Sequence, residues 1–569
     1  MAAPDKEELD AAYKEAADYW RTAHDEMTID DNYFWNRLER YMGGVTGIPA
    51  GVRLSIPPKA AEVVLRNLNH IPPKALQIIG LPKPGREGIP SQESQARATK
   101  RENWLKGAIE YDDERAYASS QLPVTLAAAE SMLLRGMAVY KTVEDVNAYE
   151  PVRQKGQGKE DFAREYERWA RDPRFPYPTT IVDPLAIFLS PSPGEYVIEE
   201  RKRYRSDVNA EAKRMGWHLE SPTKNVTVTW RAHWTPEDVV YLIDGEIVKV
   251  VHHGYGFLPF VWGFPGFGSG TLVSGNEEDG PHNIAVSLIR LVRPIILELA
   301  FKETQLAFNM QSLAFTRIVA KRNVDIPADP LKTIIYDDER PAYMMPPDKV
   351  AELLSVIAKH NDEIDRRTSP IILGGQMPRR VTTATESMVA LGESRLVLAH
   401  AVAALERMEE VRCEHKLRLL EMASKSGKAT DVRRVAVQRY AKLGVLAGHK
   451  GALVGAELTG KDVEGYYRVK ATISVKNPQE EALRLDTELR KLQAQLQSLT
   501  TTAENIGIED YDGERKQMLV EAFWREGLVG PRPPRPSGGV PSGMPVPDNM
   551  AAAVPQSVAA VESVRGAME

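Results

Sequence analysis

Apolar residues recur at helical spacing in the first quarter of the chain. The pattern predicts helices over residues 5–42, 60–69 and 91–135, with a kink in the last of them at Pro123. Glycines after residue 42 and proline pairs on either side of the short helix mark the breaks between these segments. This part of the chain is therefore expected to be mainly helical.

The period changes after Gly136, where short apolar and β-branched segments replace the helical pattern. Asp244 and Gly245 separate two of these segments and form a dipeptide typical of a two-residue β-hairpin turn. A charged helix is expected over residues 159–171. The predicted strands cover residues 138–143, 179–182, 196–198, 226–230, 239–243 and 246–251. Because strands and helices do not alternate regularly, the pattern favours an α+β fold over a parallel α/β fold.

After this region, helices alternate with irregular or extended segments. A Gly-rich segment at 263–275 leads into a predicted helix over 282–313, which is followed by a short β module at 316–343. Helical spacing returns over 348–366. Residues 368–382 contain two prolines and a glycine pair, so they are expected to form a loop.

A long helix is predicted from residue 383 to residue 426, about 44 residues against a mean of about 11–12 in globular proteins. Thr383 and Glu386 have the spacing of a capping box at its start. A strand at 467–475 and another helix follow. Leucines in that helix recur in alternating steps of four and three, at Leu485, Leu489, Leu492, Leu496 and Leu499. This seam is suited to helix–helix contact, either inside one subunit or between subunits.

The C-terminal segment has a different composition. Eight of the 39 prolines fall between Pro531 and Pro555, and no periodic apolar face remains. Such a segment buries too little apolar surface to offset the entropy lost on ordering. Residues 529–569 are therefore expected to be a disordered, Pro-rich tail.

Composition narrows the class of protein. The 569 residues are 43% hydrophobic and 27% charged, and the net charge of −6 argues against a protein that holds nucleic acid by bulk positive charge. Cys413 is the single cysteine, which excludes an internal disulfide. Charges interrupt the most apolar run, 284–301, and the acidic N-terminus lacks the apolar core of a secretory signal. A large, acidic, intracellular protein without a membrane span is expected.

No segment carries the residues that common catalytic or cofactor sites need. The Gly-rich segment at 263–275 has no lysine and therefore does not match a P-loop, and its GFGSG stretch lacks the central serine of a nucleophile elbow. His252 and His253 are neighbours on a predicted strand, so their side chains point to opposite faces and rarely bind one metal ion. Cys413 lies inside the long helix, where a buried structural thiol is expected. The sequence thus predicts no catalytic residue, no metal site and no cofactor, and no enzyme activity.

The order of these segments resembles that of the portal proteins of tailed double-stranded-DNA bacteriophages. The resemblance covers about residues 5–528. It rests on residues 182–185 (VDPL), residues 255–260 (YGFLPF), the two helices around the β module, and residues 383–386 (TATE) at the start of the long helix.

The resemblance implies an α+β, mainly helical subunit with wing, stem, clip and crown, assembled as a ring around a central channel. Such rings usually have twelve subunits. The implied parts are a wing (1–281 and 383–476), two stem helices (282–313 and 348–367), a clip (314–347), a tunnel loop (368–382), a crown (477–528) and the tail (529–569).

The same resemblance implies which residues meet the partners. The tunnel loop would present Ile371, Ile372, Leu373, Gly374, Gly375, Met377, Arg379 and Arg380 to the DNA in the channel. The clip would present Asp337, Asp338, Glu339 and Arg340 to partner proteins, although a solvated turn explains this cluster as well. Arg366, Arg367, Arg379 and Arg380 flank the loop and either contact phosphates or pair with nearby acids, including Asp362, Glu363, Asp365 and Glu386.

The expected partners are other copies of the chain, double-stranded DNA bound without sequence specificity, the major capsid protein, the terminase large subunit and head–tail adaptor proteins. The expected location is the portal vertex of the virion, and the host cytoplasm during assembly. Twelve copies at −6 each would carry −72, a charge that repels DNA and suits a channel through which DNA slides. Another ring-forming connector or a scaffold component of the virion is the main alternative. A nucleotide-driven motor is the second, and the missing P-loop lysine argues against it.

Overall fold

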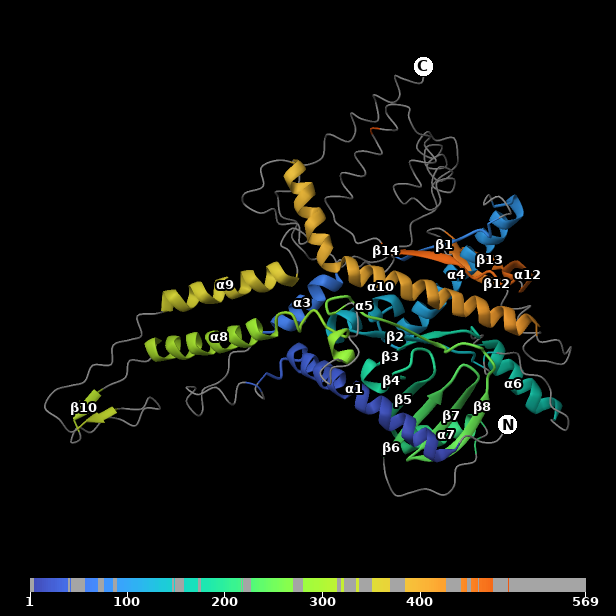
Figure 1. The fold of residues 1–569 in the computed structure, drawn as a ribbon, viewed down its shortest axis with the longest axis horizontal. Coiled ribbons are helices and arrows are strands. Elements are labelled where there is room, and N and C mark those ends of the chain that lie inside the picture. The colour runs from blue at the N-terminus through green and yellow to red at the C-terminus, as the bar shows by residue number, and fades with distance from the viewer. Residues whose placement is uncertain are drawn as a thin grey trace, which may run out of the picture. The chain divides into compact units, whose positions relative to one another are not determined.

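The computed structural model gives the fold shown in Figure 1. It describes residues 5–38, 41, 57–69, 76–84, 90–145, 148, 158–171, 175–215, 217, 227–269, 280–314, 319–321, 334–336, 350–368, 384–425, 442–447, 452–458, 460–473 and 490. Contacts divide the chain into two units, Met1–Ser498 and Leu499–Glu569, and every element below belongs to the first. No helix in the described part combines the length and the apolar character needed to cross a bilayer.

Helices dominate the N-terminal region, as the pattern predicted. They are α1 (Lys6–Phe34), α3 (Lys59–Leu68), α4 (Gln92–Ala118) and α5 (Val124–Arg135). Asp5 and Ser91 cap α1 and α4, because their side-chain oxygens accept hydrogen bonds from the backbone N–H groups of Glu7 and Ser94. The expected kink at Pro123 is wrong: the helix breaks completely at residues 119–123. Proline has no N–H and restricts the residue before it, so α4 does not continue through Pro123, which is the N-cap of the new helix that begins at Val124.

An antiparallel sheet of five strands forms most of the middle region, in the order β4-β5-β6-β7-β8. Its strands are β4 (Ile187–Leu189), β5 (Val197–Tyr204), β6 (Thr227–Trp234), β7 (Asp238–Ile243) and β8 (Glu246–His252). Asp244 and Gly245 both have positive φ, 50° and 82°, which confirms the predicted hairpin turn. β4 and α7 (Arg205–Met215) were not predicted.

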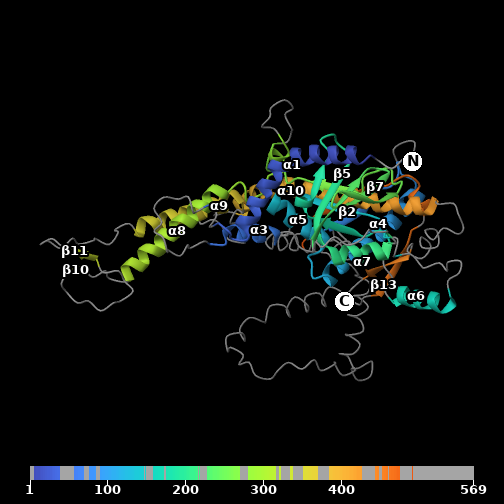
Figure 2. The ribbon, with the colours of Figure 1, turned by 90° about the horizontal axis from the view of Figure 1, so that it is seen from below.

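A smaller antiparallel sheet has the order β3-β2-β9, and α5 and the long helix α10 (Ala384–Lys425) both contact it. It consists of β2 (Ala138–Thr142), β3 (Thr179–Val182) and β9 (Phe260–Gly263). The predicted charged helix is present as α6 (Lys159–Arg171). α1 lies beside the larger sheet in the views of Figures 1 and 2. It contacts β4, where Trp20 Nε1 donates a 3.0 Å hydrogen bond to the carbonyl of Leu189.

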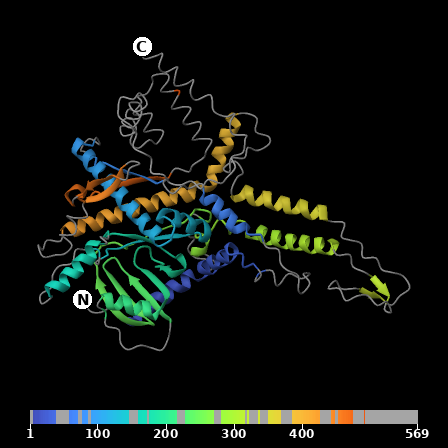
Figure 3. The ribbon, with the colours of Figure 1, turned by 180° about the vertical axis from the view of Figure 1, so that it is seen from behind.

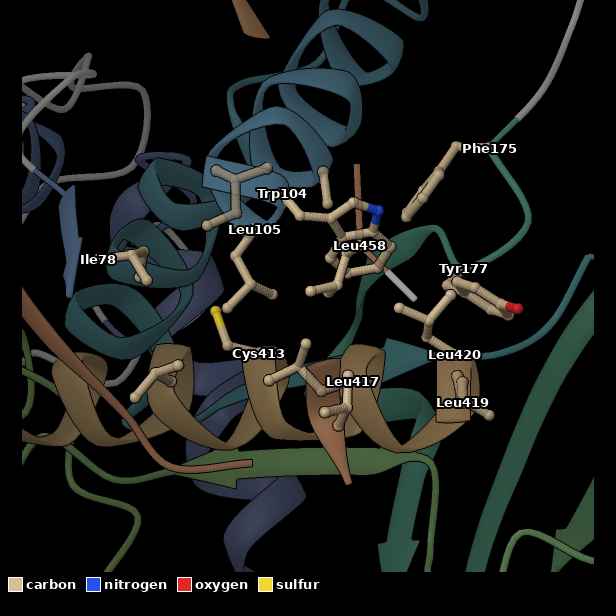
Figure 4. Packing of buried hydrophobic residues seen from close by; sticks show 14 of the residues in the cluster. Ile78, Trp104, Leu105, Phe175, Tyr177, Cys413, Leu417, Leu419, Leu420 and Leu458 are labelled. Atoms are coloured by element: carbon tan, nitrogen blue, oxygen red, sulfur yellow. The ribbon is translucent and has the colours of Figure 1, made fainter. Parts of the chain in front are cut away.

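The predicted long helix is confirmed as α10 (Ala384–Lys425), 42 residues long. It packs on α5, β2, β9 and β14 (Val469–Ile473), and β14 pairs with β1 (Leu76–Gly80). Figure 4 shows Cys413, Leu417 and Leu420 of this helix facing Trp104 and Leu105 of α4. Cys413 is buried as predicted, and burial raises the pKa of its thiol to about 12.

The first predicted stem helix begins later than expected. Residues 281–283 form a short 3₁₀ turn, η3 (Pro281–Asn283), and α8 extends only over Arg293–Ala314. The backbone N–H of Leu288 bonds the carbonyl of Leu133 in α5 at 3.0 Å, which prevents a continuous helix from residue 282. Pro294 therefore lies in the first turn, where its missing N–H costs no hydrogen bond, and it does not kink the helix.

The second predicted stem helix is α9 (Val350–Thr368), close to its expected bounds. Between α8 and α9 the described chain contains β10 (Val319–Lys321) and β11 (Ile334–Tyr336), which pair in parallel. The hairpin of β12 (Lys442–Ala447) and β13 (Ala452–Glu457), and the short α12 (Gly460–Val463), were not predicted. The leucine seam, the tail and the crown lie outside the described residues, except for Arg490.

Candidate functional site

The helical hairpin of α8 and α9 corresponds to the predicted stem. The two helices lie side by side in the views of Figures 1 and 3, and they are in contact with each other. Ile296, Leu299 and Ile364 are fully buried at one end of the pair. Met310 and Leu354, toward the other end, are 54% and 51% exposed. One end of the hairpin is thus embedded in the body, while the other has apolar side chains left uncovered by the described residues of this subunit.

An arginine fixes the start of α8 to α1. Arg293 Nε donates to Asp30 Oδ1 at 2.7 Å, and its Nη1 and Nη2 donate to the carboxylate and the carbonyl of Glu26 at 2.5 and 2.8 Å. Ser287 Oγ also donates to Asp30, at 2.8 Å. Burial raises the pKa of Asp30 to about 6, although Arg293 and Ser287 both favour its ionised form. The base of the hairpin therefore holds a carboxyl group that titrates near pH 6.

A second ion pair fixes the end of α9 to α3. Arg66 Nη1 lies 2.7 Å from Asp365 Oδ1, and Arg66 also pairs with Glu62 on its own helix. Between the two helices of the hairpin, His360 Nε2 lies 3.6 Å from Glu298 Oε1. Each helix is thus tied at the embedded end by an arginine–aspartate pair with the N-terminal region.

The residues predicted to meet DNA and partner proteins lie outside the described part of the chain. These are Ile371, Ile372, Leu373, Gly374, Gly375, Met377, Arg379 and Arg380 of the tunnel loop, and Asp337, Asp338, Glu339 and Arg340 of the clip. The structure does define where they attach. The clip cluster directly follows β11, and the tunnel loop joins the embedded end of α9 to α10.

Of the four arginines predicted near the loop, two are described. Arg367 pairs with Glu363 at 2.6 Å, one of the alternatives that the sequence left open. Asp365, another expected acidic partner, pairs with Arg66 instead. Arg366 is exposed and has no ion-pair partner among the described residues, so it is available to a group outside them.

A buried ionic cluster joins α10 to α4 and the smaller sheet, and sequence reasoning missed it. Arg412 bridges Asp112 at 2.6 Å and Glu409 at 2.9 Å, while Lys416 Nζ lies 2.8 Å from Asp112. All four side chains are fully buried. Tyr140 donates a 2.5 Å hydrogen bond to Glu409, and burial together with Glu409 keeps the pKa of this tyrosine well above 10.

The ionic cluster has two acids and two bases in mutual contact, so its formal charge is zero. Two further groups complete it: the carbonyl of Tyr177 accepts from Lys416 at 2.6 Å, and the backbone N–H of Thr179 donates to Asp112 at 3.1 Å. Complete burial keeps substrates away from these groups, so the arrangement supports positioning of α10 and not catalysis. The sequence does contain a signal for this cluster: the charged residues Arg412 and Lys416 lie next to Cys413 and Leu417, on the apolar side of the helix.

Other candidate chemistry has structural explanations. His252 Nδ1 lies 2.8 Å from Asp238, a cross-strand pair in the β7–β8 hairpin. A Cβ on Gly268 would lie 2.1 Å from the carbonyl oxygen of Asn283, so close backbone approach explains this glycine. Within the described ranges, no group of histidine, cysteine and acidic side chains could hold a metal ion.

A scan against models of known protein families finds no match. No curated protein has a significantly similar sequence.

Proposed function

We propose that this chain is the portal subunit of a tailed double-stranded-DNA bacteriophage. The ring would stand at one vertex of the capsid, pass DNA during packaging and ejection, and bind the terminase motor and later the head–tail adaptors. The observation that carries the proposal is the α8–α9 hairpin, with a short β module between its helices and a 42-residue helix after it.

The anchoring of the hairpin supports this role. A helix pair that lines a channel must resist force along the DNA, and rigid attachment at one end meets that need. The pairs Arg293–Asp30 and Arg66–Asp365 attach each helix to a different N-terminal helix. The exposed Met310 and Leu354 give the hairpin apolar area that a neighbouring copy can cover.

Charge supports the proposal as well. Each neutralised DNA phosphate releases counterions and adds affinity, so a channel for sliding DNA benefits from few basic contacts. The chain has 79 acidic and 73 basic residues. A ring of such subunits would let DNA pass without holding it.

Assembly of the purified full-length chain tests the proposal. Electron micrographs should show closed rings, and light scattering should give a mass near 760 kDa if twelve copies of 63.4 kDa assemble. A 63.4 kDa monomer at all concentrations would contradict the proposal. Packaging assays with capsid protein and terminase then separate a portal from another head–tail connector. If this chain is the portal, heads that lack it should take up no DNA, whereas heads that lack only a later connector should fill normally.

A further inference from the structure

A small hollow opens beside the C-terminal part of α10. Its volume is about 230 Å³. Three elements form its wall: α10, the loop between β8 and β9, and the residues just before β14. The lining residues are Tyr255, Phe257, Arg418, Glu421, Met422 and Tyr467. We call this the Arg418 hollow.

The guanidinium of Arg418 lies between two aromatic rings. Its central carbon is 5.5 Å from the ring centre of Phe257 and 5.2 Å from that of Tyr467. Its Nε atom is buried without a hydrogen-bond partner, and no ion pair in the described part of the chain involves this arginine. Arg418 thus differs from Arg412, six residues earlier on the same helix, which two carboxylates neutralise.

The nearby carboxylate of Glu421 is engaged elsewhere. The hydroxyl of Tyr467 donates to Glu421 Oε2, and so does the backbone N–H of Gly465, at 3.2 Å. Leaving guanidinium donors unpaired in a partly buried place costs free energy, which a ligand with matching acceptors would recover. The Arg418 hollow is therefore suited to bind a negatively charged group that does not belong to the described part of this subunit.

Shape and charge restrict what that group can be. Small-molecule pockets usually measure about 300–1,000 Å³, so a hollow of about 230 Å³ suits a single side chain better than a cofactor. An arginine stacked on rings presents a planar fork that matches a carboxylate with two parallel hydrogen bonds. A doubly charged phosphate would be repelled more strongly by Glu421 than a single carboxylate would.

We propose that the Arg418 hollow receives the side-chain carboxylate of an aspartate or glutamate from a neighbouring copy of this chain. This step rests on the proposed ring. In a ring, each interface joins two different surfaces of the same chain, so a cationic hollow on one copy needs an acidic residue on the next. The excess of acidic over basic residues supplies such partners. Arginine and aromatic side chains are also enriched in protein–protein interfaces.

Matched substitutions on one helix test the assembly step. Arg418→Gln should raise the concentration at which rings dissociate at least tenfold, measured by mass photometry on diluted full-length protein. Arg407→Gln is the control, because Arg407 lies on the same helix but is 66% exposed and already paired with Glu410. Arg407→Gln should leave dissociation unchanged. Equal dissociation of wild type and Arg418→Gln overturns the proposal.

A direct probe tests the recognition chemistry. Saturation-transfer NMR on the full-length chain, diluted until its rings have dissociated and the hollow is empty, with N-acetylglutamate N-methylamide as the probe, should give signals that Arg418→Gln abolishes. The neutral N-acetylglutamine N-methylamide should give several-fold weaker signals. Equal signals from the two probes overturn carboxylate recognition. Should Arg418→Gln fail to fold, Arg418→Lys keeps the charge but loses the planar fork, and unchanged probe binding and assembly there overturn the proposal.

The two proposals fail in different ways. If Arg418→Gln forms rings as stable as those of wild type, the hollow does not lie in the subunit interface, and the proposed portal function is not contradicted. If the wild-type chain never forms rings, the proposed portal function is wrong. A neighbouring copy is then also excluded as the occupant of the hollow.

Discussion

Charged side chains in the interior of this protein are placed by contacts between residues far apart in the chain. Asp112 and Arg412 are separated by 300 positions and meet at 2.6 Å without solvent. Burying such ions costs several kcal/mol each, and the cost is recovered only when every partner is present. Any displacement of α10 that separates these buried charges is therefore unfavourable.

Arg412→Met should lower the unfolding free energy by about 3–5 kcal/mol, because Asp112 and Glu409 remain buried without their shared cation. Arg407→Met removes an exposed pair on the same helix and should cost about 0.2–1 kcal/mol. Urea denaturation followed by tryptophan fluorescence measures both. Similar midpoints for the two variants would show that the ionic cluster contributes little.

Asp30 gives the base of the hairpin a dependence on pH. Its ordinary pKa of 3.8 is raised to about 6 in the folded protein, so the folded state binds the proton more tightly than the unfolded state does. The stability from this group is complete below about pH 4 and is lost as the pH rises through about 6. The loss amounts to about 3 kcal/mol.

Asp30→Asn has no such loss. Relative to wild type, this variant should therefore gain about 3 kcal/mol of unfolding free energy between pH 4 and pH 7. Ser287→Ala removes a donor to the ionised carboxylate, so it should raise the pKa of Asp30 further and enlarge the effect. Parallel stability curves for wild type and Asp30→Asn would contradict the raised pKa.

The helices and strands show which parts of the fold local sequence patterns can predict. Periodicity located α6, α9 and α10 closely, because each is a long or strongly patterned segment with clear ends. It placed the start of α8 too early, because the bond from Leu288 to Leu133 depends on a distant segment. The pairings Arg293–Asp30 and Arg412–Asp112 were out of reach for the same reason: no local spacing encodes them.

The exposed end of the hairpin should pack against another copy. Replacing Met310 and Leu354 together by glutamine should weaken ring assembly while changing the stability of the monomer by only about 0.5 kcal/mol, as for exposed sites in general. Leu122→Gln is the control, since Leu122 is also exposed but lies between α4 and α5. Rings of the double variant that match those of wild type at every dilution would exclude this contact.

The tunnel loop should be needed for packaging or retaining DNA and not for folding. Replacing residues 371–377 by a Gly/Ser linker should leave rings intact and lower the yield of DNA-filled heads, because the apolar groups proposed to line the bore are lost. Electron microscopy of the rings and a nuclease-protection assay of filled heads measure the two effects. Loss of rings would make the loop structural, and normal packaging would make it dispensable.

At the scale of the whole molecule, the net charge predicts that the proposed ring binds DNA only weakly. With a net charge of −6, the assembled protein should bind linear double-stranded DNA no more tightly than about 10⁻⁴ M at physiological salt, at the weak end of non-specific binding. Filter binding at two salt concentrations measures this. Micromolar binding that falls steeply with salt would reveal a basic surface and contradict the proposed sliding channel.

The position of α10 also has a consequence for synthesis. The core around Trp104 and the ionic cluster around Asp112 both need residues 409–420, about 300 positions later in the chain. Ribosomes add about 5–20 residues per second, so roughly 15 to 60 s pass between the emergence of α4 and that of its partner helix. During that interval the apolar faces of α4, α5 and β2 have no permanent cover from α10. The part of the body that packs on α10 must therefore complete its folding late, once most of the chain has left the ribosome, and this part of the nascent chain is most exposed to aggregation just before α10 appears.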